Sequence, residues 1–345
     1  MRSLSVVAIV LALGTMACGR EAPEPDARTD AMGAADSPDP YIDVSRDSVD
    51  GDVGVDSTLG DGEVGSTAWQ PIPTPPGHRQ LLSIWGASDD DIWIVGYTDI
   101  PTPNKKSFLH WDGARFNEFS TGEGTLNSVW GSSPIDVVAV DQNSEVWHWE
   151  GSGWTGVTLG DPLLIATAGS SADDVWLLGT KSVFHRAGLA ASWLPGGTGL
   201  TDHPWRVLSA RNGEAWLTSP DGFAARWEGG SWHDAPSPGS GVEGMWISAA
   251  TDLWVVRVTG EIGHYDGAVW KGVASPTSKS LQSVYGVGPN DIWAVGDGGT
   301  VLHWDGSRWA LEETHSAASL TGVWGTPRSV WAVGAAGTVL RRTRS

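Results

Sequence analysis

The sequence predicts an all-β protein, a seven-bladed β-propeller with four-stranded blades. Three observations lead to this prediction: seven repeats of about forty residues, four strand-like segments in each repeat, and complementary missing strands at the two ends of the repeated region. All 22 tryptophans of the 345-residue chain lie in this region, between Trp69 and Trp331.

The repeat is clearest between Leu281 and Trp309, where four strand-like segments follow one another. Aligning the units on one position of the second segment gives spacings of 45, 38, 40, 38, 39 and 38 residues. The aligned residues are Trp93, Val138, Trp176, Trp216, Trp254, Trp293 and Trp331. We therefore expect seven copies of one structural unit.

Each unit contains four short runs of β-branched and aromatic residues, bounded by Gly, Asp and Pro. The first reads Leu-x-Ser-Val-Trp-Gly, the second Asp-Ile-Trp-x-Val-Gly and the third Gly-Thr-Val-Leu-His-Trp, and the fourth surrounds a single Trp. Asp-Gly between the third and fourth runs is a strong hairpin signal. It occurs at 112–113, 266–267 and 305–306, with Glu-Gly variants at 150–151 and 228–229. Four strands in about forty residues are typical of a propeller blade.

The two ends of the repeated region complement each other. The seventh unit stops after its third strand, in residues 337–345, and an orphan Trp69-Gln70-Pro71-Ile72 precedes the first unit. An N-terminal strand that completes the last blade would close the ring and remove its free edges. We therefore expect the last blade to be closed by this segment.

These motifs resemble those of the WD40, YVTN and BNR-like propeller superfamily, and more closely those of Trp-rich bacterial lipoproteins. The second group carries Ser-Val-Trp-Gly, Asp-Val-Trp-Ala-Val-Gly and His-Trp-Asp-Gly repeats. The resemblance covers residues 67–345 and implies an architecture, with almost no information on activity. The Asp-box of sialidases is absent, and the WD40 Gly-His and Trp-Asp pair is not in its usual place.

Residues 1–17 are expected to be a signal peptide. A basic Arg2 precedes an apolar run from Leu4 to Leu13, which is shorter than the roughly 20 residues that span a bilayer. Ala17-Cys18 resembles the bacterial lipobox, which implies lipidation of Cys18, although Thr15 replaces the usual Leu. The alternative is ordinary cleavage that leaves Cys18 as a free thiol. With Gly19 next, we expect export across the inner membrane and a lipid anchor in the outer membrane, facing the periplasm or the outside.

Residues 18–66 are expected to form an acidic, disordered tether. From residue 19 the segment holds 13 acidic and 3 basic residues and almost no aromatics, so it cannot bury enough apolar surface to fold. Its aspartates loosely suggest a calcium loop, but Gly54 and Val55 stand where an EF-hand needs an acid or amide and then Gly. A plain tether is favoured, and calcium binding stays open.

Recurring polar residues in the blades are interpreted as structural. The third-strand histidines are expected to hydrogen-bond within their own blade, because equivalent residues around a ring do not converge on one metal ion. The pre-strand acids are expected to fix the turns. The histidines are His110, His148, His185, His264 and His303, with Arg226 and Arg341 in two other units; the acids are Asp91, Asp136, Asp174, Glu214, Asp252 and Asp291. No catalytic motif, metal site or cofactor site is found, so an enzyme is not expected.

A ligand is expected on the loops, because the strands of a propeller are committed to packing. The long connections between units lie at 117–125, 155–163, 194–204, 233–241, 271–280 and 310–319. The same face carries an insertion from Tyr97 to Ser107, with Lys105 and Lys106 in an otherwise acidic domain. Tyr97, Lys105 and Lys106 are therefore the candidate binding residues.

Two functions remain open: a monomeric envelope scaffold for a protein partner, or a lectin-like module for envelope or extracellular polysaccharide. His203, His233, His315 and Trp205 lie in or beside the loops but do not align across the units, which favours the protein partner. Residues 67–345 hold 28 acidic and 17 basic residues, so nucleic acid is not an expected ligand.

Overall fold

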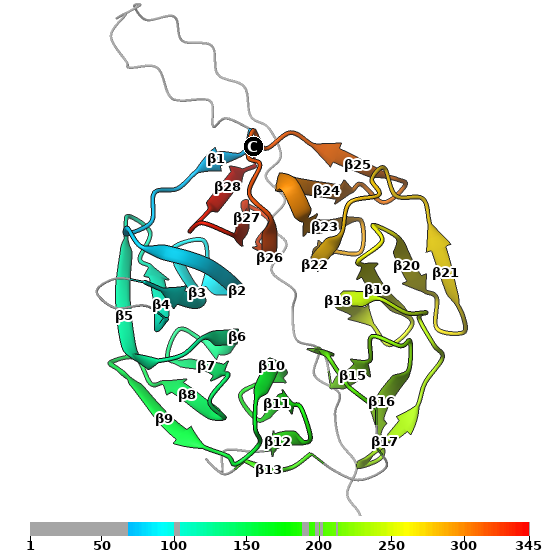
Figure 1. The fold of residues 1–345 in the computed structure, drawn as a ribbon. Helices are drawn as coiled ribbons and strands as arrows, with labels where there is room; N and C mark the ends of the chain where they lie inside the picture. The colour runs from blue at the N-terminus through cyan, green and yellow to red at the C-terminus, as the bar shows by residue number, and fades with distance from the viewer. Residues whose placement is uncertain are drawn as a thin grey trace, which may run out of the picture. The chain divides into compact units, whose positions relative to one another are not determined.

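The computed structural model describes residues 68–99, 104–187, 193–196, 200, 203–211 and 213–344. These residues form seven sheets, each of four antiparallel strands, arranged in a ring (Figure 1). The predicted seven-bladed propeller is confirmed. The expected signal peptide (1–17), the tether (18–66) and Cys18 lie outside the described residues. The part that is described contains no helix long and apolar enough to cross a membrane.

Strands are numbered along the chain, and equivalent strands recur in every blade. The first strands are β2 (His78–Ser88), β6 (Leu126–Ser133), β10 (Leu164–Ser171), β14 (Val207–Arg211), β18 (Val242–Ala249), β22 (Leu281–Gly288) and β26 (Leu320–Gly325). The second strands are β3 (Asp91–Thr98), β7 (Asp136–Asp141), β11 (Asp174–Gly179), β15 (Glu214–Thr218), β19 (Asp252–Arg257), β23 (Asp291–Gly296) and β27 (Ser329–Gly334).

The third and fourth strands lie farther from the centre of the ring. The third strands are β4 (Lys105–Trp111), β8 (Glu145–Trp149), β12 (Val183–Ala187), β16 (Ala224–Glu228), β20 (Ile262–Tyr265), β24 (Thr300–Trp304) and β28 (Val339–Thr343). The fourth are β5 (Phe116–Glu123), β9 (Trp154–Thr158), β13 (Leu194–Pro195), β17 (Ser231–Asp234), β21 (Trp270–Val273), β25 (Trp309–Glu312) and, in the last blade, β1 (Gln70–Pro71). A short 3₁₀ turn, η1 (Asp297–Gly299), precedes β24.

The N-terminal strand closes the ring, as the sequence predicts. Strand β1 pairs with β28, with Gln70 opposite Arg341, and the Ile72 N–H donates to the Val339 carbonyl at 2.9 Å. Trp69 is 3% exposed and packs edge-on against Trp293 of the preceding blade, with ring centroids 5.8 Å apart. The closing segment therefore joins two blades and covers the edge of β28.

The second-strand tryptophans fill the spaces between blades, which confirms their structural interpretation. All six are at most 3% exposed. Trp93, for example, contacts Trp149 and Trp154 of the next blade, with centroids 4.9 and 5.0 Å apart. Because an indole buries roughly 150–250 Å², these residues supply much of the apolar surface that holds neighbouring blades together.

The Trp-Gly pair of the first-strand motif has a specific packing reason. A Cβ on Gly131 would lie 2.7 Å from the Trp85 indole of the preceding blade, and a Cβ on Gly86 would lie 2.7 Å from Trp324. The same contact links Trp246 to Gly286, at 2.3 Å. Each indole thus needs a residue without a side chain on the next first strand, and the two halves of the motif serve adjacent blades.

Candidate binding site at one mouth of the channel

The third-strand histidines hydrogen-bond within their own blades, as predicted. Each Nε2 donates to Oδ1 of the pre-strand aspartate of that blade, at 2.8 Å for His110 and Asp91, 2.6 Å for His148 and Asp136, 2.8 Å for His185 and Asp174, 2.7 Å for His264 and Asp252, and 2.9 Å for His303 and Asp291. Four of these imidazoles also stack on the second-strand Trp, at 3.7 Å between centroids for His185 and Trp176.

The pre-strand aspartates bind more groups than the predicted turn-fixing role requires. Asp136 and Asp291 pair with Arg186 and Arg344 of neighbouring blades. Asp174 accepts from Ser170 across the turn between β10 and β11, and also from His185 and the Trp176 indole N–H. Burial alone would raise the pKa of Asp174, but these hydrogen bonds outweigh it and hold the pKa below its ordinary value. No group of three or more potential metal-ligating side chains occurs within the described ranges.

Lys106 has a structural role that the sequence did not predict. Its Nζ lies 2.7 Å from Asp141 Oδ2 of the next blade, pairs with Glu145, and lies 5.0 Å from the centroid of the Trp147 ring. The side chain is only 4% exposed. Burial alone would lower the pKa of Lys106, but the two carboxylates raise it. Lys106 is therefore a buried link between blades, and its expected role as a surface contact is wrong.

The insertion itself lengthens a hairpin. Strands β3 and β4 pair as far as Thr98 and Lys105, and β5 follows β4 over Phe116–Glu123. The expected loop at 117–125 is thus mostly strand. Tyr97 and Lys105 are partly exposed, and residues 100–103 lie outside the described part. A binding role for Tyr97 and Lys105 stays a prediction.

Two cavities lie in line along the centre of the ring, one toward each face. Both reach Leu208, Met245 and Val284, which mark the middle of the channel. The cavity on the face of the connections between units has a volume of about 610 Å³. There the Arg206 guanidinium is paired with Glu243 at 2.8 Å. The second cavity, of about 600 Å³, lies toward the turns between first and second strands.

Aromatic side chains from one position of the first strands surround the second cavity. We call this set the aromatic collar: Trp85, Trp130, Trp246, Tyr285 and Trp324. The register places each one opposite the aligned second-strand residue of its blade. Ala168 and Ser209 occupy the same position in the third and fourth blades, so the collar has a gap on that side.

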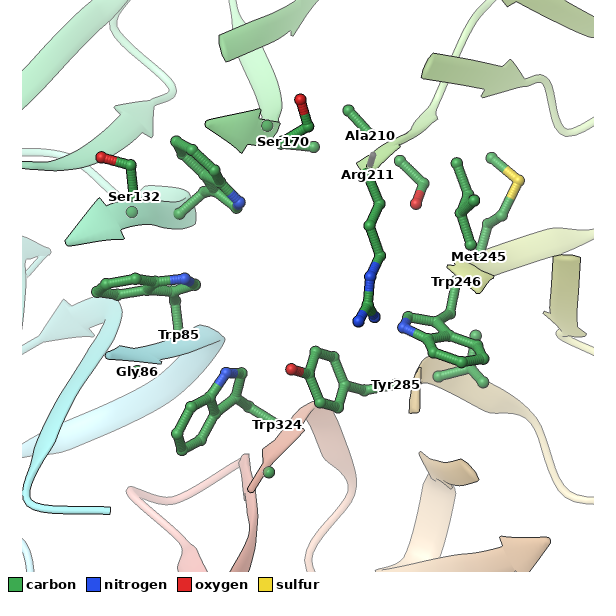
Figure 2. A pocket seen from close by; sticks show the side chains of 18 of the residues that line it. Trp85, Gly86, Ser132, Ser170, Ala210, Arg211, Met245, Trp246, Tyr285 and Trp324 are labelled. Atoms are coloured by element: carbon green, nitrogen blue, oxygen red, sulfur yellow. The ribbon is translucent and has the colours of Figure 1, made fainter. Parts of the chain in front are cut away.

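Arg211, at the end of β14, extends from the side of this gap into the cavity. Figure 2 shows its guanidinium near Trp246 and Tyr285. The Arg211 Cζ lies 5.4 Å from the centroid of the Trp246 ring, a cation–π contact. Burial raises the pKa of Tyr285, partly offset by the charge of Arg211, so the phenol stays protonated at neutral pH and its hydroxyl can donate.

Sequence reasoning predicted a ligand on the opposite face and did not point to this cavity. The sequence contained one signal for this cavity. The first-strand Trp recurs in the motif but is replaced in the third and fourth units, and Arg211 follows two residues after Ser209 of the fourth unit. Only the closed ring shows that these positions meet around one cavity.

No protein-family model and no curated protein matches the sequence. Solved structures do match the fold. The structure of YCF48 bound to D1 peptide is 17% identical with a TM-score of 0.67, covering 82% of this chain and 99% of that one. The WD40 propeller domain of Doa1 is 12% identical with a TM-score of 0.66, covering 81% and 98%. Virginiamycin B lyase from Staphylococcus aureus is 15% identical with a TM-score of 0.62, covering 80% and 99%.

The chain is therefore a seven-bladed β-propeller, a fold that it shares with these solved structures. The matched structures include a protein named as a lyase and one bound to a peptide. Because one architecture serves such different proteins, function has to be argued from the site.

Proposed function

We propose that this chain is a non-catalytic binding protein whose propeller holds a protein partner at the aromatic collar. The observation that carries the proposal is the open cavity of about 600 Å³ in which aromatic rings surround one arginine. Tyr, Trp and Arg are the residues that most often dominate binding energy at protein interfaces. The fold of YCF48, whose structure contains a D1 peptide, is compatible with this role.

The proposal includes a location at the cell envelope. Cys18 would carry a lipid in the outer membrane, and the acidic segment that follows would act as a tether for a monomeric propeller. The support is the lipobox-like Ala17-Cys18 after an apolar run. The lectin-like alternative keeps one supporting observation, because the partly exposed collar rings of Trp85, Trp130 and Tyr285 are also suited to stacking against sugars.

Site-specific photo-crosslinking in intact cells tests the site. A photoreactive phenylalanine analogue would replace Tyr285 in the collar, Lys105 on the insertion, or Val157, which is 54% exposed on an outer strand. We expect one defined protein adduct from position 285 and none from position 157. An adduct from position 105 alone would move the site to the opposite face, and no protein adduct together with competable binding on a glycan array would support the lectin.

A further inference from the structure

The charge of the collar cavity is unusual for this domain. Residues 67–345 carry 28 acidic and 17 basic residues, yet the residues that line this cavity include Arg211 and no Asp or Glu. Arg211 forms no ion pair with any residue that the structure describes. At the opposite mouth, Glu243 neutralises Arg206 at 2.8 Å. Of the two cavities, the collar cavity is therefore the one with a positive charge that no carboxylate among the described residues neutralises.

We propose, building on the proposed function, that the collar recognises a carboxylate on an extended peptide segment of the partner, next to an apolar side chain. The carboxylate would lie against the Arg211 guanidinium and accept a hydrogen bond from the Tyr285 hydroxyl. Figure 2 shows both groups directed into the same cavity. The apolar neighbour would pack against Trp85 and Trp130, the two collar tryptophans that are partly exposed.

The donor set favours a carboxylate over a phosphate. One guanidinium compensates one negative charge and can bind a carboxylate through two parallel hydrogen bonds. A phosphate carries close to two charges at neutral pH and is usually met by several cations. Arg211 is the only Lys or Arg among the residues that line this cavity.

The inner end of the cavity favours a peptide over an acidic sugar. Leu208, Met245 and Val284 form this end and offer aliphatic surface without side-chain donors or acceptors. An apolar side chain gains from burial there. A sugar placed at the same depth would leave hydroxyl groups without partners, at a cost in binding free energy.

The test uses the full-length protein and an array of short random peptides, each made in two forms. One form is native, and in the other Asp and Glu are replaced by Asn and Gln. We expect the best ligands to carry an acidic residue beside a large apolar one, and the amide form to bind about ten-fold more weakly or worse. Arg211→Gln should cause the same loss and should make the two forms bind alike, as expected of a coupled pair.

Arg206→Gln is the matched control, because it removes the same group from the other mouth and should leave peptide binding unchanged. Tyr285→Phe keeps the ring and removes only the hydroxyl, so it tests the site independently should Arg211→Gln fail to fold. This variant should weaken binding several-fold.

Amidating the peptide C-terminus distinguishes a chain-end carboxylate from a side-chain carboxylate. A peptide that binds through its chain end would lose affinity, and one that binds through a side chain would not. Either result supports the proposal.

Neutral or basic peptides that bind best and keep their affinity when the C-terminus is amidated would overturn the inference, as would acidic peptides that bind Arg211→Gln as well as wild type. A preference for uronic-acid oligosaccharides over every peptide would also overturn it. These failures differ from failure of the proposed function. If the partner still crosslinks at position 285 but binds independently of Arg211, the collar remains the binding site and only the carboxylate is wrong.

Discussion

Close contact between an indole and a glycine determines how the blades meet around the channel. The Trp85 ring occupies the space where residue 131 would carry its Cβ, and the distance of 2.7 Å is too short for a carbon–carbon contact. The substitution Gly131→Ala should therefore lower the free energy of unfolding by about 1–3 kcal/mol, measured by urea denaturation.

The matched control for this substitution is Gly272→Ala. Gly272 also lies in a strand, but an added Cβ there would contact nothing within 4 Å. This variant should be as stable as wild type or slightly more so, because Ala reduces the freedom of the unfolded chain. Equal stability of the two variants would show that the Trp85 ring can move away without cost.

Removal of Lys106 should be strongly destabilising, because its cation is buried between two blades. In Lys106→Met, the Asp141 carboxylate, whose side chain is fully buried, would lose its cation. We expect a loss of about 3 kcal/mol in unfolding free energy. Lys271→Met is the control, since Lys271 pairs with Asp266 at 2.6 Å but is 63% exposed, and it should change stability little. Similar losses in both variants would contradict the structural role of Lys106.

The depressed pKa of Asp174 predicts a defined pH dependence. A carboxyl whose folded pKa lies below its ordinary value of 3.8 contributes stability that is present above 3.8 and is lost as the pH falls through the folded pKa. The substitution Asp174→Asn keeps an acceptor but removes the charge. It should cost about 1–2 kcal/mol at neutral pH, and this difference from wild type should shrink as the pH falls below 3.8.

Asp173→Asn serves as the comparison for this pH series, because Asp173 is exposed and has no hydrogen-bond partner among the described residues. Its stability should follow that of wild type at every pH. A pH-independent loss in Asp174→Asn would mean that shape and not charge is responsible.

At the scale of elements, β1 decides whether the ring is closed. The strand is only two residues long, but Trp69 beside it packs against Trp293, and the segment covers β28. Truncation to residues 67–345 should leave the melting temperature unchanged. Truncation to residues 77–345 should lower it by several degrees, since it removes a buried Trp and exposes a strand edge.

Calorimetry and gel filtration of the two truncated proteins test this prediction together. The shorter protein should also self-associate through the free edge of β28. Identical melting curves and monomeric elution of both proteins would show that the last blade is stable with three strands.

At the scale of the whole molecule, the proposed lipid anchor makes a simple prediction. Cys18→Ala should remove the acylated residue, so the protein should move from the membrane fraction to the soluble fraction and should no longer incorporate radiolabelled palmitate. Propeller stability should not change, because residue 18 lies outside the repeats. A wild-type protein that is soluble and unlabelled would support ordinary signal cleavage instead.

The seven blades, their four strands, the closing segment and the buried Trp positions could all be predicted from the sequence. The reason is that each is encoded locally and repeated: Asp-Gly turns, short β-branched runs and a Trp every forty residues or so reinforce one another across the chain. Pairing of the histidines within their blades was predictable for the same reason, since both partners belong to one repeat.

Tertiary structure alone decided which residues are free to bind. Lys106 looks like a surface cation until the next blade brings Asp141 to within 2.7 Å of it. Arg211 and the collar residues come from different blades, and Trp85 and Trp324 are far apart in sequence. Closing a ring makes the first strands of all blades converge on one axis, so a departure from the repeat in any blade changes a shared cavity. Sequence patterns within one repeat predict the structure of each blade, but they do not show which charged residues form ion pairs with residues of another blade.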